Sequence, residues 1–359
     1  MKPPQISELL KPDVIGQNAA VKEVSVALYK HLIGHRTGNV LMIGGSGTGK
    51  TTIMRSVETL LRTGEKFKEY GTVVRINANL LADLASRGQQ SSVVLEKLAA
   101  EAALRLGADA TPQDIAKAVS HGIVFVDEID KIRSHVGERP NVSGIIAQES
   151  LLTLMEGEVQ NVAIPVDPHS GDGRTVPMPV DTKTILFIMG GAFEELYDQV
   201  FDRVTANGKN PPWRLVTKAD GSIERQIVFQ LAKHMEHADL FNYGMSPQFL
   251  ARFDSIVTLR NLGSKDLVTI FRDTSDSIWP AAVDYFANYG VTLKLDESAL
   301  NYIADKASEN SRIGARALKE VFSRIIKEYE YDPFASGLVN DQKELVIDLE
   351  MAKQAFDQS

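Results

Sequence analysis

Cysteine is absent from the 359-residue chain. Disulfides, thiolate catalysis and cysteine-ligated zinc or iron–sulfur sites are therefore excluded. Long hydrophobic runs are also lacking, because no stretch approaches the roughly 18 apolar residues of a membrane-spanning helix and no apolar signal core follows the first residues. We therefore expect a soluble, cytoplasmic protein that makes no contact with a membrane.

The chain also lacks an excess of positive charge. It has 39 Lys and Arg side chains against 47 Asp and Glu, a net charge of −8. This balance argues against a protein that coats nucleic acid, although a local basic site stays possible. With 43% hydrophobic residues the chain can bury a real core, and its length predicts two domains.

Short apolar runs alternate with longer helical patterns over the first two thirds of the chain. The predicted strands are residues 39–43, 72–76, 122–126 and 184–189. The predicted helices include residues 51–61, 93–106 and 145–156. Such alternation predicts an α/β fold with a parallel sheet covered on both faces. The segment 165–179 is rich in Pro, Gly and Asp and is predicted to be a long surface loop.

The pattern becomes helical after residue 261. Helices are predicted at residues 264–274, 278–289, 297–309 and 314–329, and a terminal strand at 344–349. We therefore expect a large α/β domain over residues 1–261 and a small, mainly helical domain over residues 262–359. The small domain carries 17 acidic and 11 basic side chains, a net charge of −6.

A glycine-rich loop between the first strand and the first long helix gives the strongest local signal. Its sequence, GGSGTGKT at residues 44–51, satisfies G-x-x-x-x-G-K-[ST] in the strand–loop–helix context that a phosphate loop requires. Its glycines let backbone N–H groups turn toward a β-phosphate, and the helix N-terminus adds partial positive charge. The predicted ATP-binding residues here are Gly45, Ser46, Gly47, Thr48, Gly49, Lys50, Thr51 and Thr52. Lys50 would reach the β- and γ-phosphates, and Thr51 would ligate Mg²⁺.

Two carboxylates follow a buried strand, in the sequence IVFVDE at residues 123–128. Alone, such a pair is usually a solvated turn, but the upstream phosphate loop favours a catalytic role. Asp127 is expected to hold Mg²⁺, directly or through water. Glu128 is expected to polarise the water that attacks the γ-phosphate.

Asp127-Glu-Ile-Asp-Lys-Ile132 resembles the acidic motif of AAA+ ATPases of the ClpX/HslU clade. Further matches follow in the same order: VIGQ at residues 14–17, LLTLMEG at 151–157, ILFIMGGAF at 185–193, SPQFLARF at 246–253 and GARAL at 314–318. The resemblance covers about residues 10 to 349. It implies that Val14 and Ile15 contact adenine, and that the chain forms a homo-oligomeric ring, six subunits being the expectation for the family.

Two arginines gain a role only through this resemblance. Arg252, in SPQFLARF, matches the arginine finger that reaches the neighbouring subunit's ATP site. Arg316, in GARAL, matches the sensor 2 arginine that contacts the γ-phosphate of its own subunit. An arginine at the γ-phosphate neutralises charge that develops on the transferred group.

The chain also departs from the clade. Where the clade's pore loop reads Gly-Tyr-Val-Gly, residues 85–88 read ASRG, so that Ser86 and Arg87 replace the aromatic grip. No Ile-Gly-Phe tripeptide occurs between residues 193 and 244, so docking to the ClpP peptidase is not expected. No cysteine-rich zinc domain is expected before Val14, and no polar sensor 1 residue stands at 189–191.

The sequence thus predicts a Mg²⁺-dependent ATPase whose ring remodels or unfolds a specific protein client without ClpP. An alternative is an ATP-dependent nucleic-acid-binding or regulatory ring, in which Arg87, Arg133 and Arg139 line the channel. A third possibility is an ATP-gated scaffold. Salt-sensitive DNA binding would favour the nucleic-acid-binding ring over the other two hypotheses. Client-stimulated ATPase activity would distinguish the remodelling ring from the scaffold.

Overall fold

The structure is a computed structural model. It describes residues 1–35, 38–64, 67, 70–85, 90–166, 173–206, 213–217, 223–227, 229–274, 277–309, 313–335 and 337–357. The chain divides into two compact units. The first unit comprises Met1–Leu10, Ala19–Gly44 and Lys50–Leu259, and the second comprises Lys11–Asn18, Gly45–Gly49 and Arg260–Ser359. The predicted division after residue 261 stays a prediction.

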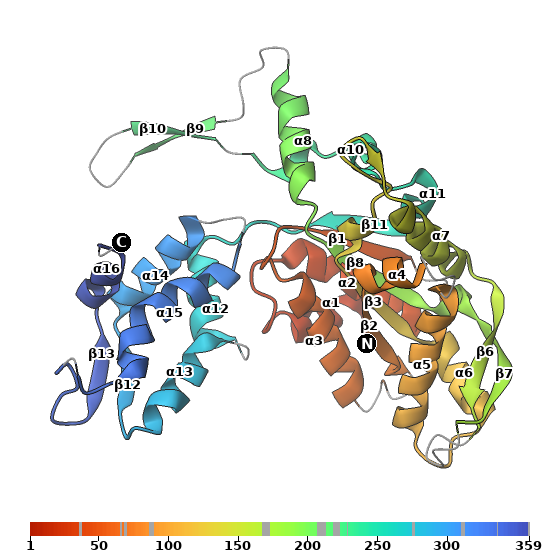
Figure 1. Ribbon diagram of the computed structural model, residues 1–359, viewed down its shortest axis with the longest axis horizontal. Helices are drawn as coiled ribbons and strands as arrows, with labels where there is room; N and C mark the ends of the chain where they lie inside the picture. The colour runs from red at the N-terminus through yellow and green to blue at the C-terminus, as the bar shows by residue number, and fades with distance from the viewer. Residues whose placement is uncertain are drawn as a thin grey trace. The chain divides into compact units, whose positions relative to one another are not determined.

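A five-stranded parallel sheet forms the centre of the first unit (Figure 1). Its strands, in spatial order, are β11 (Phe253–Thr258), β1 (Asn39–Ile43), β8 (Leu186–Gly191), β3 (Ile123–Asp127) and β2 (Val73–Asn77). β1 and β8 are buried along their whole length, which explains their near-continuous apolar sequences. Because all strands run parallel, their carboxyl ends lie at one edge of the sheet, where ligands bind in open α/β sheets.

Helices surround this sheet. Those of the first unit are α1 (Pro3–Leu10), α2 (Asn18–Leu32), α3 (Lys50–Thr63), α4 (Ala78–Ala85), α5 (Gln90–Leu106), α6 (Pro112–Ser120), α7 (Val142–Glu156), α8 (Glu194–Thr205), α9 (Leu231–His234), α10 (His237–Tyr243) and α11 (Pro247–Leu250), with 3₁₀ turns at Ile129–Ile132 and Thr182–Thr184. Val124 and Val126 of β3 share one hydrophobic core with Leu98 of α5 and Leu151 of α7. α3 is amphipathic and packs against β8, burying one apolar stripe.

Antiparallel hairpins are added to the first unit. They are β4 (His135–Val136) with β5 (Arg139–Pro140), β6 (Val159–Pro165) with β7 (Thr175–Asp181), and β9 (Trp213–Thr217) with β10 (Ile223–Ile227). The predicted loop over 165–179 is wrong at both ends, because Pro165 ends β6 and residues 175–179 belong to β7. Pro177 and Pro179 are tolerated because β6 and β7 pair only with each other, and proline is confined to such edge strands.

The second unit is mainly helical. Its elements are α12 (Ser264–Asp273), α13 (Ile278–Ala287), β12 (Thr292–Leu295), α14 (Glu297–Glu309), α15 (Arg316–Tyr331), β13 (Glu344–Ile347) and α16 (Leu349–Asp357). Its core includes Phe271, Phe286 and Phe322, and the rings of Phe271 and Phe322 meet edge to face at 5.0 Å. The strand predicted at 344–349 is β13, which pairs in parallel with β12 and is followed by α16.

The structure confirms the predicted fold class. The strands expected at 39–43, 72–76, 122–126 and 184–189 are β1, β2, β3 and β8, with ends shifted by at most two residues. Among the described residues, no helix is both long and apolar enough to cross a bilayer.

Candidate nucleotide-binding site

The phosphate-loop sequence lies between β1 and α3, at the carboxyl edge of the sheet. β1 ends at Ile43 and α3 begins at Lys50. Gly47 and Gly49 have φ angles of +69° and +105°, a backbone region that glycine adopts readily. A Cβ atom on Gly47 would lie 2.1 Å from the Ile313 carbonyl oxygen, so no other residue fits there. The backbone of the loop therefore requires glycine at Gly47 and favours it at Gly49.

Lys50 is the first residue of α3, and it is buried. Its ammonium group donates a hydrogen bond to the Gly44 carbonyl at the start of the loop. The cation is thus held beside the helix N-terminus, where an anion is also favoured by the helix dipole. This is the position from which the side chain could turn to a bound phosphate.

Thr51 and Asp127 are brought together from α3 and the end of β3. The Thr51 hydroxyl donates to Asp127 Oδ2 across 3.0 Å, although the two residues are 76 positions apart in sequence. A hydroxyl and a carboxylate are hard oxygen donors of the kind that Mg²⁺ prefers. The two predicted metal ligands therefore fit a shared Mg²⁺ ion.

Glu128 has a left-handed backbone conformation, with φ 59° and ψ 37°, which is uncommon for a residue with a side chain. Its Oε2 atom accepts hydrogen bonds from the side-chain amides of Asn77 and Asn79, each at 2.9 Å. Asn77 ends β2 and Asn79 lies at the start of α4. These two asparagines were missed by the sequence analysis, and the rule that parallel strand ends meet at one edge could have indicated Asn77.

The second unit contains the middle of the loop, residues 45–49, together with the VIGQ segment. Gln17 is 3% exposed and its amide donates to the Thr48 and Arg260 carbonyls, both at 2.8 Å. Val14 is also buried, and Ile15 is partly buried. The sequence indicated Gln17 only as a member of the VIGQ motif. In the structure its side-chain amide holds the Thr48 carbonyl of the loop.

Arg316 begins α15 and contacts the phosphate loop directly. Its Nη1 atom donates to the Ser46 hydroxyl at 2.7 Å, and the Ala315 N–H donates to the Gly47 carbonyl at 3.0 Å. A guanidinium group at the loop is suitably placed for a phosphate. The role at the γ-phosphate that the resemblance implies for Arg316 stays a prediction.

Arg252 lies away from these residues in the sequence, one position before β11. Its Nη2 atom forms an ion pair with Glu156 Oε1 at 2.7 Å, and its carbonyl accepts from the Asn39 amide at 2.9 Å. The side chain is 36% exposed. The backbone is therefore anchored to the sheet. The guanidinium group is partly buried, since its Nε atom is shielded from solvent while its Nη2 atom pairs with Glu156.

The end of β8 offers no polar side chain, as the sequence suggested. Gly190 and Gly191 end this strand, and a Cβ atom on Gly190 would lie 3.5 Å from Lys50 Cδ. Asp130 is the buried polar group beside this turn, and its Oδ1 atom accepts from the Ala192 N–H at 3.0 Å. The atom nearest to a Cβ on Gly190 would be Met54 Cε, at 3.2 Å, so the tightest restriction at Gly190 comes from α3 through Met54.

The predicted channel arginines have different surroundings. Ser86 and Arg87 lie outside the described residues. Arg133 forms a two-pronged pair with Glu195 and lies 5.1 Å from the centre of the Tyr243 ring. The Glu195 hydrogen bonds raise the pKa of Arg133 although its burial opposes this. Arg139 is exposed on the β4–β5 hairpin, one residue after Glu138.

A phosphate loop after a buried parallel strand, with a carboxylate beside its threonine, defines a phosphate-loop nucleotide-binding protein. Comparison with known families agrees. The family model described as AAA domain (Cdc48 subfamily) matches residues 35–256, and the model of the C-terminal, D2-small domain of ClpB protein matches residues 282–347. The chain belongs to the AAA domain family.

Curated relatives narrow this assignment. The chain is similar to the ATP-dependent Clp protease ATP-binding subunit ClpX of Bacteroides thetaiotaomicron, with 29% identity over all of this chain and 82% of the relative. The same protein of Bacteroides fragilis gives the same figures, and that of Porphyromonas gingivalis is 28% identical over 97% of this chain and 80% of the relative. The predicted resemblance is confirmed: this is a ClpX-like AAA+ ATPase, a family whose members hydrolyse ATP.

Proposed function

We propose that the chain is a Mg²⁺-dependent ATPase whose turnover drives remodelling of a protein client. The observation that carries the ATPase site is the 3.0 Å contact between Thr51 and Asp127. It joins the phosphate loop to the acidic strand end, so one metal ion could be held by both. The bound metal would neutralise charge on the β- and γ-phosphates.

Each remaining residue of the site has a separate task. The loop amides and Lys50 bind the phosphates of ATP, since Lys50 is already held at the loop by Gly44. Glu128 accepts a proton from the attacking water, and Asn77 and Asn79 fix the orientation of its carboxylate. Arg316 reaches the γ-phosphate within its own subunit, which its contact with Ser46 supports.

A ring is required if Arg252 serves the ATP site of a neighbour. Its side chain is 36% exposed and pairs with the half-exposed Glu156 through Nη2. The relatives are named as ATP-binding subunits of a protease, which is consistent with work on protein clients. We propose a homo-oligomeric ring, with six subunits by analogy to the clade.

Independence from ClpP is the most specific part of the proposal. It rests on the sequence, which has no Ile-Gly-Phe tripeptide between residues 193 and 244 and has Ser86 and Arg87 at the expected pore loop. An aromatic side chain offers apolar area to any polypeptide, whereas serine offers almost none. We therefore expect the ring to act on a particular partner and to thread a generic protein poorly.

A stably folded fluorescent reporter with an unstructured tag tests this proposal. The natural chain with ATP should leave the fluorescence largely unchanged, with or without ClpP, while Ser86→Tyr should increase the rate of loss. Glu128→Gln serves as the control without hydrolysis. Rapid unfolding of the reporter by the natural chain, or its degradation when ClpP is added, would contradict the proposal.

The nucleic-acid alternative is weakened by the surroundings of Arg133. Glu195 neutralises this guanidinium group, and Glu138 stands beside Arg139 in the same hairpin segment. A channel that follows a phosphate backbone needs uncompensated positive charge. Binding of single-stranded DNA that weakens steeply with salt would restore this alternative.

A further inference from the structure

A buried glutamine in α7 has no part in the site described above. Gln148 is 2% exposed, and its side-chain amide contacts three main-chain groups. Nε2 donates to the Ile132 carbonyl at 2.7 Å and to the Gly244 carbonyl at 3.0 Å, and Oε1 accepts from the Ser246 N–H at 2.8 Å. Both amide protons are therefore used. Because the side chain is buried, removing it would leave main-chain polar groups without a partner.

The three partners of this glutamine belong to two segments of the site. Ile132 ends the 3₁₀ turn that begins directly after Glu128. Gly244 caps the end of α10, and Ser246 precedes α11 at the start of the SPQFLARF motif. We call residues 244–253, which include Arg252, the finger segment. The glutamine thus ties the finger segment both to α7 and to the acidic strand end (Figure 1).

The finger segment is held as one piece between Ser246 and Arg252. Its short helix begins at Pro247, and the Ser246 hydroxyl accepts from the Phe249 N–H at 3.3 Å. The Arg252 N–H donates to the Phe249 carbonyl at 3.1 Å. The Phe249 ring is fully buried and meets the Phe253 ring edge to face at 5.2 Å. A shift of Ser246 against α7 would therefore be carried to the backbone of Arg252.

We infer that Gln148 is a positioning residue: by fixing the finger segment, it places Arg252 for the ATP site of the neighbouring subunit. The inference rests on the proposed ring, in which Arg252 serves a neighbour. Glu156, also on α7, holds the Arg252 side chain only through an exposed ion pair, which fixes the guanidinium group weakly. Gln148 instead holds the main chain through buried bonds. A misplacement of about 1 Å can lower a rate about a hundredfold, so this distant support matters for catalysis.

The same glutamine has less influence on the ATP site of its own chain. The Glu128 carboxylate accepts from Asn77 and Asn79, each at 2.9 Å. Loss of the bond from Gln148 to the Ile132 carbonyl leaves both of these donors in place. Replacing Gln148 should therefore affect the arginine that the chain gives to its neighbour more than the ATP site that the chain itself carries.

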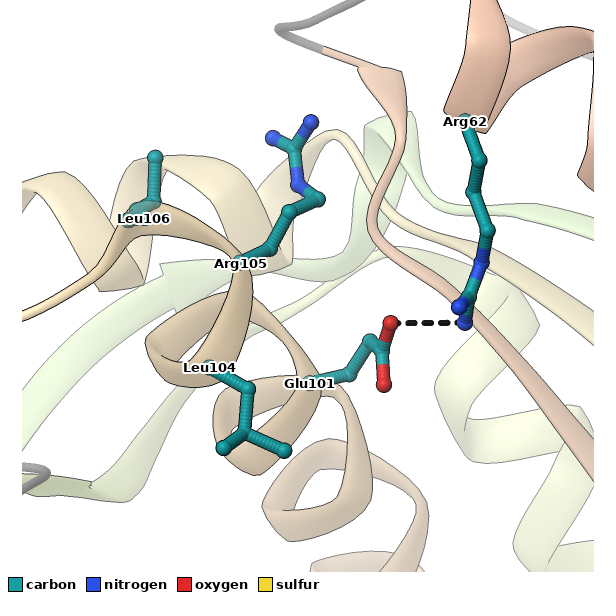
Figure 2. A pocket seen from close by; sticks show the side chains of 5 residues that line it. All are labelled: Arg62, Glu101, Leu104, Arg105 and Leu106. Carbon is teal, nitrogen blue, oxygen red and sulfur yellow. Dashed lines mark hydrogen bonds and ion pairs between the residues drawn. The ribbon is translucent and has the colours of Figure 1, made fainter.

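An exposed polar contact between two other helices provides the matched control. Arg62 of α3 pairs with Glu101 of α5 at 2.7 Å and with Glu58 at 3.1 Å, beside the pocket that Figure 2 shows. The Arg62 side chain is 47% exposed, so water can replace its bond to Glu101. Glu101→Met therefore removes an interhelical polar contact at the surface, whereas Gln148→Met removes one in the interior.

Mixed rings test the inference. Lys50→Ala chains can supply only the arginine and Arg252→Ala chains can supply only the ATP site, so the ATP turnover of their equal mixture is the reference. With Gln148→Met added to the Lys50→Ala chains, turnover should fall about tenfold to a hundredfold below the reference. With Gln148→Met added to the Arg252→Ala chains instead, turnover should stay within about twofold of the reference. Glu101→Met should leave both mixtures within about twofold of it.

An equal fall in the two Gln148→Met mixtures would overturn the inference, because a general loss of stability acts on both. Gln148→Leu removes the same bonds and should give the same asymmetry, so the result does not depend on the folding of one variant. Sedimentation checks that each mixture forms rings. A reference mixture that forms rings but shows no turnover would overturn the neighbour role of Arg252, and this inference with it. Turnover in the reference without a difference between the two Gln148→Met mixtures would overturn this inference alone.

Discussion

Removal of the Arg252 guanidinium group tests whether ATP hydrolysis is shared between subunits. In the folded chain this group pairs with Glu156 at 2.7 Å, with the two side chains 36% and 40% exposed. An exposed pair of this kind contributes about 0–1 kcal/mol, so releasing Arg252 from Glu156 changes a rate by at most about fivefold. An arginine that neutralises the γ-phosphate contributes about 10³- to 10⁵-fold, or about 4 to 7 kcal/mol.

These magnitudes give different expectations for two variants. Arg252→Ala should reduce kcat by about a thousandfold or more. Glu156→Gln should change kcat by less than about fivefold, because only the resting pair is lost. Equal effects of the two substitutions would mean that Arg252 acts through its pair with Glu156 and has no role at the phosphates.

Mixing two inactive variants then tests whether Arg252 serves the ATP site of its own subunit or that of a neighbour. Arg252→Ala chains have an intact phosphate loop, and Lys50→Ala chains have an intact Arg252, so a mixed ring restores one complete site where they adjoin in the right order. In an equal mixture about one contact in four has that order, so turnover should return to about a quarter of the natural rate. Arg316→Ala mixed with Lys50→Ala should show no recovery. If rings form and the first mixture stays inactive, Arg252 does not serve a neighbour.

Three further predictions concern single residues. Lys50→Ala should abolish ATP binding, whereas Glu128→Gln should keep binding and stop turnover, measured by nucleotide titration and phosphate release. Asn77→Ala or Asn79→Ala should each lower kcat about three- to tenfold with KM unchanged, because Glu128 loses one of its two orienting donors at 2.9 Å. Burial lowers the pKa of His31 to about 4 from 6.5, so the unfolded chain takes up its proton first as the pH falls. The free energy of unfolding should therefore decrease by about 3 kcal/mol from pH 6.5 to pH 4, and His31→Gln should remove this contribution in urea unfolding at both pH values.

For each of these three predictions, one outcome would contradict the reasoning. Loss of ATP binding by Glu128→Gln would remove the water-activating role from that residue. A change of KM without a change of kcat in the asparagine variants would place them in substrate binding. An acid dependence that is the same in His31→Gln and the natural chain would show that carboxylates alone cause it.

Much of the fold could be predicted because its signals are local. β1, β3 and β8 are buried on both faces, so each is a continuous apolar run that is visible in the sequence. β11, with the sequence FDSIVT, is an edge strand that lies half in solvent, and its only partner in the sheet is β1, more than 200 residues earlier. β12 is likewise defined by its pairing with β13. Few side chains of β11 and β12 are buried, so neither strand is a continuous apolar run.

The candidate site shows the same division between local and distant information. The 3.0 Å contact of Thr51 with Asp127 follows from two motifs and from the rule that parallel strands end at one edge. By contrast, Gln17 holds the Thr48 carbonyl, and Arg316 holds the Ser46 hydroxyl from 270 positions away. The spacing of residues around the loop predicts neither the contact with Gln17 nor the contact with Arg316.

These distant contacts explain why the middle of the phosphate loop belongs to the second unit although its flanking residues Gly44 and Lys50 belong to the first. Gln17 also donates to the Arg260 carbonyl, and Arg260 forms two parallel bonds of 2.7 Å with the carboxylate of Asp266 in α12. Burial alone would raise the pKa of Asp266, but the hydrogen bonds from Arg260 and Gly263 outweigh it and leave the pKa below its ordinary value. The carboxylate therefore stays ionised and the link to α12 is kept. A continuous series of polar contacts thus runs from Thr48 through Gln17 and Arg260 to Asp266 in α12.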